Sequence, residues 1–193
     1  MVRSFSSEPL DPAVVDAIVE AALRAPSAGN TRGSAWVVLA GREETAAYWD
    51  ATTDDAWRAE HPRRWEGLRR APVVLLAYSN ADLYVARYAE ADKGGSRLGE
   101  GPEQWPVPYW TGDAAFGVMT VLLAAVDAGL GACVLGAFRG EAALADALAV
   151  PAADGWRLFC AVALGHPDGN DCRSRSLARP APSKRQRVHR GGW

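Results

Sequence analysis

The chain has few cysteines, little net charge and no apolar run long enough for a membrane helix. Each of these features argues against a class of protein. Three cysteines without CxxC spacing argue against a disulfide framework and a zinc site. A formal net charge of −2 provides no overall attraction to nucleic acid. The longest apolar stretch, Ala114–Val126, is shorter than the ~20 residues of a membrane helix, and no apolar signal sequence follows Met1. We therefore predict a cytoplasmic protein that binds neither nucleic acid nor membrane.

Motifs for common catalytic machinery are also absent. The sequence has no GxGxxG after an expected strand and no GxxxxGK[ST], so neither glycine-rich phosphate loop is expected. Only three histidines occur, and no serine or cysteine lies in a nucleophile motif. Acidic pairs such as Glu43-Glu44 are adjacent in sequence, so their side chains point in different directions and are expected on the solvated surface. We assign no catalytic side chain and no metal ligand, and we disfavour a hydrolase.

The chain does have enough apolar residues for a folded core. With 193 residues, 49% of them hydrophobic, we expect one domain over residues 1–193. Apolar spacing predicts helices at Asp11–Arg24, Arg42–Trp49, Asp113–Ala128 and Glu141–Leu148. Buried strands are expected at Ala35–Ala40, Pro72–Tyr78, Ala132–Phe138 and Leu158–Leu164. The segment Ala81–Trp110, rich in glycine, proline and aromatic residues, has no strong period, and a stretch of that length is expected to be functional or partly helical.

Two of the expected helices have features that a structure can test. Asp11 is predicted to cap the first helix, with Pro12 at its first position, where a missing N–H costs nothing. The helix Asp113–Ala128 is apolar nearly all round, so we expect it to be central and buried. The order of helices and strands, taken alone, favours a parallel α/β sheet.

Two loops beside buried strands could contact a flat polar ligand. Ala25–Thr31 follows a helix and offers a hydroxyl, an amide and exposed backbone groups. Leu135–Ala137 contains a glycine at which a ligand can approach the backbone closely. Each loop alone also fits ordinary structure, a helix C-cap with turn residues for the first and a β-bulge for the second.

Taken together, these segments resemble the FMN-dependent nitroreductase family. The resemblance begins at Arg3-Ser4-Phe5 and continues through the sequence APSAGNT at Ala25–Thr31. It resumes in the helix that ends at Gly129-Leu130-Gly131, and then in Leu135-Gly136 and Gly165-His166-Pro167. It covers nearly the whole chain, and the order and spacing of these motifs make it more specific than any one of them.

The resemblance implies an α+β fold, a nitroreductase-like three-layer sandwich with a mixed, mainly antiparallel sheet flanked by helices in an intertwined homodimer. For this reason we set aside the parallel sheet. The resemblance also implies FMN as the cofactor, bound at the dimer interface, with NADH or NADPH as the reductant. The reduced flavin would then pass two electrons to a nitroaromatic, a quinone or a similar planar acceptor.

Five cofactor-binding residues follow from the resemblance in the two loops. Ser27 and Asn30 match the loop that reaches the FMN bound mainly by the partner subunit, and Arg32 follows them where the family commonly has glutamine. Leu135 and Gly136 match the backbone that lies against the isoalloxazine ring near its N5 atom.

Three basic residues are expected at the phosphate end of the cofactor. Arg3 lies where the family has a basic residue that contacts the ribityl phosphate or the pyrimidine edge, and Lys184 and Arg185 replace a basic pair near the C-terminus. The family usually has Arg-Arg-Ser before this point, and Met1 stands where that serine would be. We therefore expect the in-frame DNA upstream of Met1 to encode further arginines.

Two alternatives stay open at this stage. The sparse phosphate site also fits a degenerate relative that serves as a flavin-binding or structural dimer without turnover. The aromatic segment Trp105–Trp110 also fits a lid for one dedicated metabolite, which the flavin would dehydrogenate or dehalogenate.

Overall fold

The protein is built around one four-stranded sheet with the strand order β1-β2-β4-β3. The computed structural model describes residues 1–136, 138–170, 179–180 and 187–192. The strands are β1 (Ser34–Ala40), β2 (Val73–Asn80), β3 (Gly131–Leu135) and β4 (Trp156–Gly165). All three strand pairings are antiparallel, as expected from the resemblance. The parallel arrangement that element order favoured is wrong, because the helices between β1 and β2 return the chain to the same end of the sheet.

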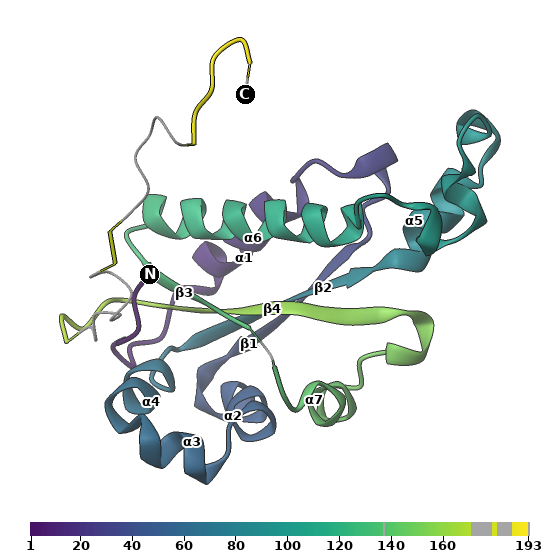
Figure 1. The fold of residues 1–193 in the computed structure, drawn as a ribbon. Helices are drawn as coiled ribbons and strands as arrows, with labels where there is room; N and C mark the ends of the chain where they lie inside the picture. The colour runs from purple at the N-terminus through teal and green to yellow at the C-terminus, as the bar shows by residue number, and fades with distance from the viewer. Residues whose placement is uncertain (137, 171–178, 181–186, 193) are drawn as a thin grey trace.

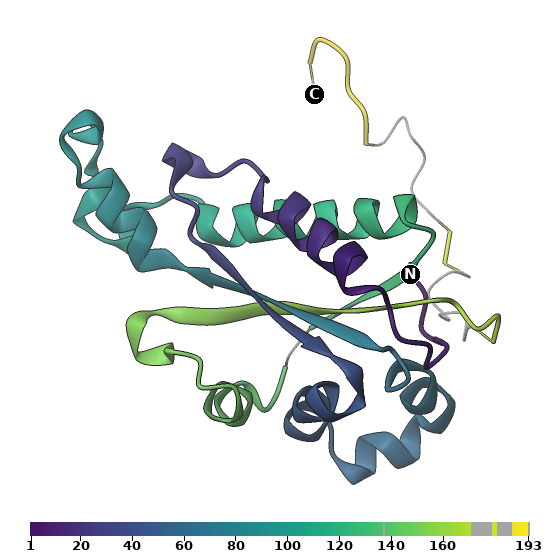
Figure 2. The same ribbon diagram turned by 180° about the vertical axis from the view of Figure 1, so that it is seen from behind.

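Helices cover both faces of this sheet and complete three layers (Figures 1 and 2). One face is covered by α1 (Pro12–Leu23) and α6 (Tyr109–Asp127), which pack on each other. Four shorter helices lie on the other face: α2 (Gly41–Thr52), α3 (Asp55–Glu60), α4 (Pro62–Leu68) and α7 (Glu141–Ala147). The three-layer α+β sandwich is confirmed, while α3 and α4 were not expected from the sequence.

Strand β2 supplies both halves of the core. Every residue of β2 is buried, and its side chains alternate between the two faces of the sheet. Leu75 points to the cluster under α1 and α6, and Leu76 points to the cluster under the shorter helices. Burial on both faces explains why this strand appears in the sequence as an unbroken apolar run.

The first helix begins as expected. The Asp11 carboxylate accepts the Ala13 N–H at 2.9 Å, and Pro12 occupies the first helical position. Val15, Ile18 and Ala22 form its buried stripe against the sheet. Capping, proline placement and apolar spacing therefore act together to define this element.

The segment Ala81–Trp110 is partly helical, which is one of the two expectations for it. It begins with α5 (Ala81–Tyr88), which the Asn80 side chain caps by accepting the Asp82 N–H at 2.9 Å. Three short 3-10 turns follow, at Ala91–Lys93, Arg97–Glu100 and Pro102–Gln104. Figure 1 shows α5 and these turns projecting beyond one end of the sheet. Their aromatic side chains, rather than an apolar period, hold the segment together, which is why periodicity missed α5.

The expectation that α6 is central and buried is confirmed for one side of the helix within the single chain. One side packs on the sheet and α1 through buried residues, including Asp113, Val118 and Val121. The opposite side exposes four large apolar residues by half or more of their surface: Phe116, Met119, Leu123 and Val126. By length and composition alone α6 could also cross a membrane, but a core helix of a soluble protein meets the same criteria.

Two smaller expectations concern β3 and β4, and one of them is wrong. Cys133 and Cys160 are buried core residues, as expected. Strand β3 ends at Leu135 instead of extending to Phe138, whose side chain is 96% exposed. The pairing with β4 stops at Leu135, and without a partner strand the chain leaves the sheet.

Candidate functional site

The loop after α1 is held in an unusual backbone conformation. Its 3-10 turn, η1 (Ala28–Asn30), contains left-handed residues at Gly29 (φ 62°) and Asn30 (φ 53°), and Arg32 follows at φ 56°. Non-glycine residues rarely adopt this region, so surrounding contacts must hold it. Within the loop, Ser27 Oγ accepts the Arg32 N–H at 2.8 Å, and Arg32 Nε donates to Asn30 Oδ1 at 3.2 Å. These bonds bring the three predicted residues Ser27, Asn30 and Arg32 together.

Residues that the sequence did not reveal support this loop from outside. The Asp113 carboxylate on α6 accepts the Ala28 N–H at 2.7 Å and the Tyr84 hydroxyl at 2.8 Å. Arg87 on α5 donates through Nε to the Gly29 carbonyl at 3.0 Å. An acidic residue within an apolar helix was the available signal, and a polar group there requires a partner.

A small cavity of about 240 Å³ lies beneath the loop. Ser27 and Arg32 line it together with Trp36 and Asp113. It belongs to the α1 and α6 side of the sheet.

A larger cavity of about 440 Å³ lies on the other side, at the end of β3. The predicted residues Leu135 and Gly136 line it, opposite Trp49, Thr52 and Arg64 from the shorter helices. This volume falls within the ~300–1,000 Å³ typical of ligand pockets. The cavity therefore brings the predicted residues Leu135 and Gly136 together with side chains that were not predicted from the sequence.

The β3 cavity is lined by aromatic residues and by a glycine that lies close to an aromatic ring. The indole Nε1 of Trp49 is buried and has no hydrogen-bond partner among the described residues. A Cβ added at Gly136 would lie 2.5 Å from the Phe138 ring, so the absence of a side chain lets the Phe138 ring pack against this backbone. Burial raises the pKa of Tyr48 to about 12, so this phenol stays neutral and cannot act as a base near pH 7.

Arg3 lies on the same side as the β3 cavity. Val2 donates its N–H to the Ala132 carbonyl on β3 at 2.9 Å. A Cβ at Gly67 of α4 would meet the Arg3 carbonyl at 2.5 Å, so the backbones of these two residues are closely packed. Gly67 precedes Leu68, which lines the cavity. Lys184 and Arg185 lie outside the described residues.

The predicted residues thus form two separate groups within one chain. Leu135 and Gly136 line the β3 cavity, with Arg3 packed against α4 on the same side, while Ser27 and Arg32 line the cavity on the α1 and α6 side. The two cavities share no lining residue. A single chain therefore does not bring the expected cofactor residues into one site.

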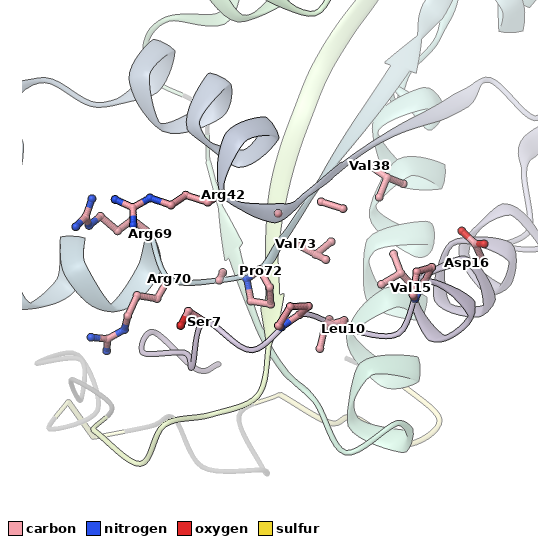
Figure 3. Close-up of a pocket in the computed structure, with 15 residues that line it drawn as sticks. Ser7, Leu10, Val15, Asp16, Val38, Arg42, Arg69, Arg70, Pro72 and Val73 are labelled. Atoms are coloured by element: carbon pink, nitrogen blue, oxygen red, sulfur yellow. The ribbon is translucent and has the colours of Figure 1, made fainter.

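A third cavity, of about 530 Å³, contains none of the predicted residues. Figure 3 shows its apolar side, formed by Leu10, Val15 and Val38, and its basic side, where Arg42 and Arg69 lie close together. It lies beside β1, which pairs only with β2 among the described residues and so forms one edge of the sheet.

Comparisons with solved structures agree with the three-layer fold. A candidate nitroreductase from Desulfovibrio desulfuricans in complex with FMN is 25% identical, with a TM-score of 0.62, and the match covers 94% of this chain and 91% of that one. A candidate NADH oxidase from Clostridium acetobutylicum is 18% identical, with a TM-score of 0.64 and coverages of 100% and 95%. An FMN-dependent nitroreductase from Clostridium difficile R20291 is 17% identical, with a TM-score of 0.64 and coverages of 100% and 94%.

The sequence comparisons give a family but no characterised relative. No curated protein matches the chain. The profile of the Nitroreductase family matches residues 1–166, which is most of the sequence and includes both predicted loops. The chain belongs to the nitroreductase family and is a flavin oxidoreductase by fold and descent.

Proposed function

We propose that the protein is an FMN-dependent NAD(P)H oxidoreductase that reduces nitroaromatic, quinone or similar planar acceptors. The observation that supports this most is the β3 cavity, which Leu135 and Gly136 line together with Trp49 in a chain of this family. When bound, FMN supplies two-electron transfer through its N5 atom. The similar candidate NADH oxidase supports a nicotinamide as reductant. We also place the protein in the cytoplasm.

The residues around the β3 cavity fit a flavin. Leu135 and Gly136 line the cavity together with the aromatic residues Trp49 and Phe138, whose rings suit a flat ligand. Arg64 adds a guanidinium at the cavity wall, and Arg3 lies close by on the same side. Arginine suits phosphate because its donors can form paired, charge-assisted bonds. These arginines can replace part of the basic charge that the sequence lacks at the phosphate end.

We further propose that the working site forms between two copies of the chain. The loop with Ser27, Asn30 and Arg32 lies across the sheet from the β3 cavity, so its residues can reach a flavin only in another subunit. The exposed side of α6 offers the matching interface. Phe116, Met119, Leu123 and Val126 follow the three- and four-residue spacing of helices that pack in pairs. Exposed apolar patches of this kind are uncommon on monomers.

The first experiment measures flavin binding by the purified protein. Apo-protein is titrated with FMN and with FAD while flavin fluorescence is recorded, and FMN alone is expected to bind. Binding weaker than roughly 100 μM, or about 5–6 kcal/mol, would instead favour the degenerate dimer without turnover. Light scattering on the same sample is expected to give a dimer at micromolar concentration, and a monomer with bound flavin would contradict the shared site.

A substitution in the loop tests the shared site more closely. Asn30→Ala removes an exposed amide of the loop and is expected to weaken FMN binding by about 1–2 kcal/mol, the value of one ligand hydrogen bond. The dimer should stay intact, and the melting temperature should fall only slightly, because alanine is less favourable than asparagine at this left-handed position. Asn170→Ala is the matched control, because Asn170 is also exposed but lies after β4, away from the loop. Equal FMN affinities for the two variants would exclude Asn30 from the site.

A further inference from the structure

One buried carboxylate joins three parts of the molecule at the cofactor loop. We propose that Asp113 is a positioning residue that holds the loop Ser27–Arg32 in its ligand-binding conformation. The inference rests on the proposed function, since the loop is taken to contact FMN. Asp113 itself is 5% exposed, and the donors from which its carboxylate accepts, Ala28 and Tyr84, both belong to the protein, so its role follows from these bonds.

The geometry assigns this task to a single atom. Asp113 Oδ2 accepts both the Ala28 N–H, at 2.7 Å, and the Tyr84 hydroxyl, at 2.8 Å. A carboxylate taken out of water is costly unless donors compensate it, and both donors here come from outside α6. The carboxylate therefore ties η1 and α5 to α6, which packs on the sheet.

The loop needs such an anchor because its own backbone is unfavourable. Gly29, Asn30 and Arg32 are all left-handed, and two of them carry side chains that disfavour this region. The anchored residue, Ala28, immediately precedes them. Releasing the Ala28 N–H would let the loop relax toward commoner backbone conformations, and Asn30 would lose its place.

Tyr84 donates to the same carboxylate and also packs against the end of the loop. It is fully buried, and a Cβ at Gly33 would lie 2.3 Å from its ring, so it packs directly against the end of the loop. Burial, with the neighbouring Asp113 carboxylate, raises the pKa of Tyr84, so its hydroxyl remains a donor throughout the neutral range. The projecting aromatic segment that starts at α5 is thereby fastened to the same carboxylate.

Two substitutions at Asp113 separate anchoring from simple core packing. Asp113→Ala removes the acceptor and is expected to weaken FMN binding by at least about tenfold, since both donors are left unpaired. Asp113→Asn keeps an oxygen that can accept both bonds without the charge, so it should recover most of the affinity. Val121→Ala is the matched control, because Val121 is a buried α6 residue in contact with the core and not with the loop.

Hydrogen exchange supplies a readout that does not need FMN. The Ala28 amide should be protected in the wild type and in Asp113→Asn, and should exchange at least about tenfold faster in Asp113→Ala. Val121→Ala should lower the melting temperature without changing Ala28 protection or FMN affinity. If Asp113→Ala does not fold, Tyr84→Phe replaces it, since loss of one donor should shift the affinity in the same direction by a smaller factor.

The outcomes distinguish this inference from the proposed function. Normal FMN affinity and normal Ala28 protection in Asp113→Ala, or in Tyr84→Phe where that variant replaces it, would overturn the anchoring role. A parallel loss of affinity in Val121→Ala would also overturn it, by showing that any loss of stability has the same effect. A wild type that binds no FMN would contradict the proposed function alone, and the exchange of Ala28 would still decide whether Asp113 holds the loop.

Discussion

The two sides of α6 have similar apolar composition but opposite surroundings. Val121 is fully buried against the sheet, while Leu123, two residues later, is 60% exposed. The buried side is completed by the chain itself, through α1 and the β2–β4 centre of the sheet. The exposed side has the same kind of residues with nothing on them among the described parts of the chain. The difference indicates that an apolar helix can serve a core on one side and an association surface on the other.

The largest effect is expected from a charge on the buried side. Val121→Asp places a carboxylate where no donor is available, and an uncompensated buried charge costs at least about 3–5 kcal/mol. For a chain of this size the melting temperature should fall by roughly 6–20 °C. Circular dichroism during heating measures this. A melting temperature equal to that of the wild type would show that Val121 is not a core residue.

The same charge on the exposed side should act on association instead. Leu123→Asp removes an apolar contact worth about 1.5–3 kcal/mol per copy, and a symmetric interface contains two copies. The dimer should therefore dissociate about 10²–10⁴ times more readily, as measured by light scattering over a dilution series. Secondary structure should be retained.

A matched control for Leu123→Asp lies on the opposite layer of the protein. Ala59→Asp introduces the same charge on an exposed position of α3 and should leave the dimer intact. If Ala59→Asp and Leu123→Asp dissociate equally, or neither does, α6 is not the interface.

The smallest effect concerns a thiol beneath the buried side. Cys160 packs in the same cluster as Val121, and burial raises its pKa from 9.0 to about 12. The neutral thiol is therefore favoured in the folded state, and this contribution to stability is complete below pH 9 and is lost as the pH rises toward 12. Cys160→Val should flatten the decline of the melting temperature with pH in that window.

Thiol labelling at pH 8 also compares the two sides of α6. Peptide mass spectrometry identifies which cysteine is labelled. Cys160 should resist labelling in the wild type and in Leu123→Asp, because thiolate is the reactive form. It should become reactive in Val121→Asp. Rapid labelling of Cys160 in Leu123→Asp would mean that the two sides of α6 are not independent.

Local signals in the sequence were sufficient for the elements whose energetics are local. Asp11 and Pro12 predicted the start of α1, and the apolar runs predicted β2 and β4 within a few residues. The helix α5 was not assigned although Asn80 caps it locally, because its aromatic contacts, such as Tyr84 with Trp105, come from residues distant in sequence. The assignment of cofactor residues stays a prediction, although the loop and the β3 cavity now have definite positions.

The sequence by itself determined the family, the capped first helix and the two loops, because these depend on residue order and short-range chemistry. Only the tertiary structure decided which sides of α6 and of the sheet each loop faces. It also brought Asp113 to Ala28 across 85 positions and Arg64 to the cavity of Gly136. Such contacts depend on how elements that are distant in sequence pack together, and no local pattern of residues specifies that packing. The separation of Ser27 from Gly136 is of this kind, and it is the physical basis for expecting a second copy of the chain.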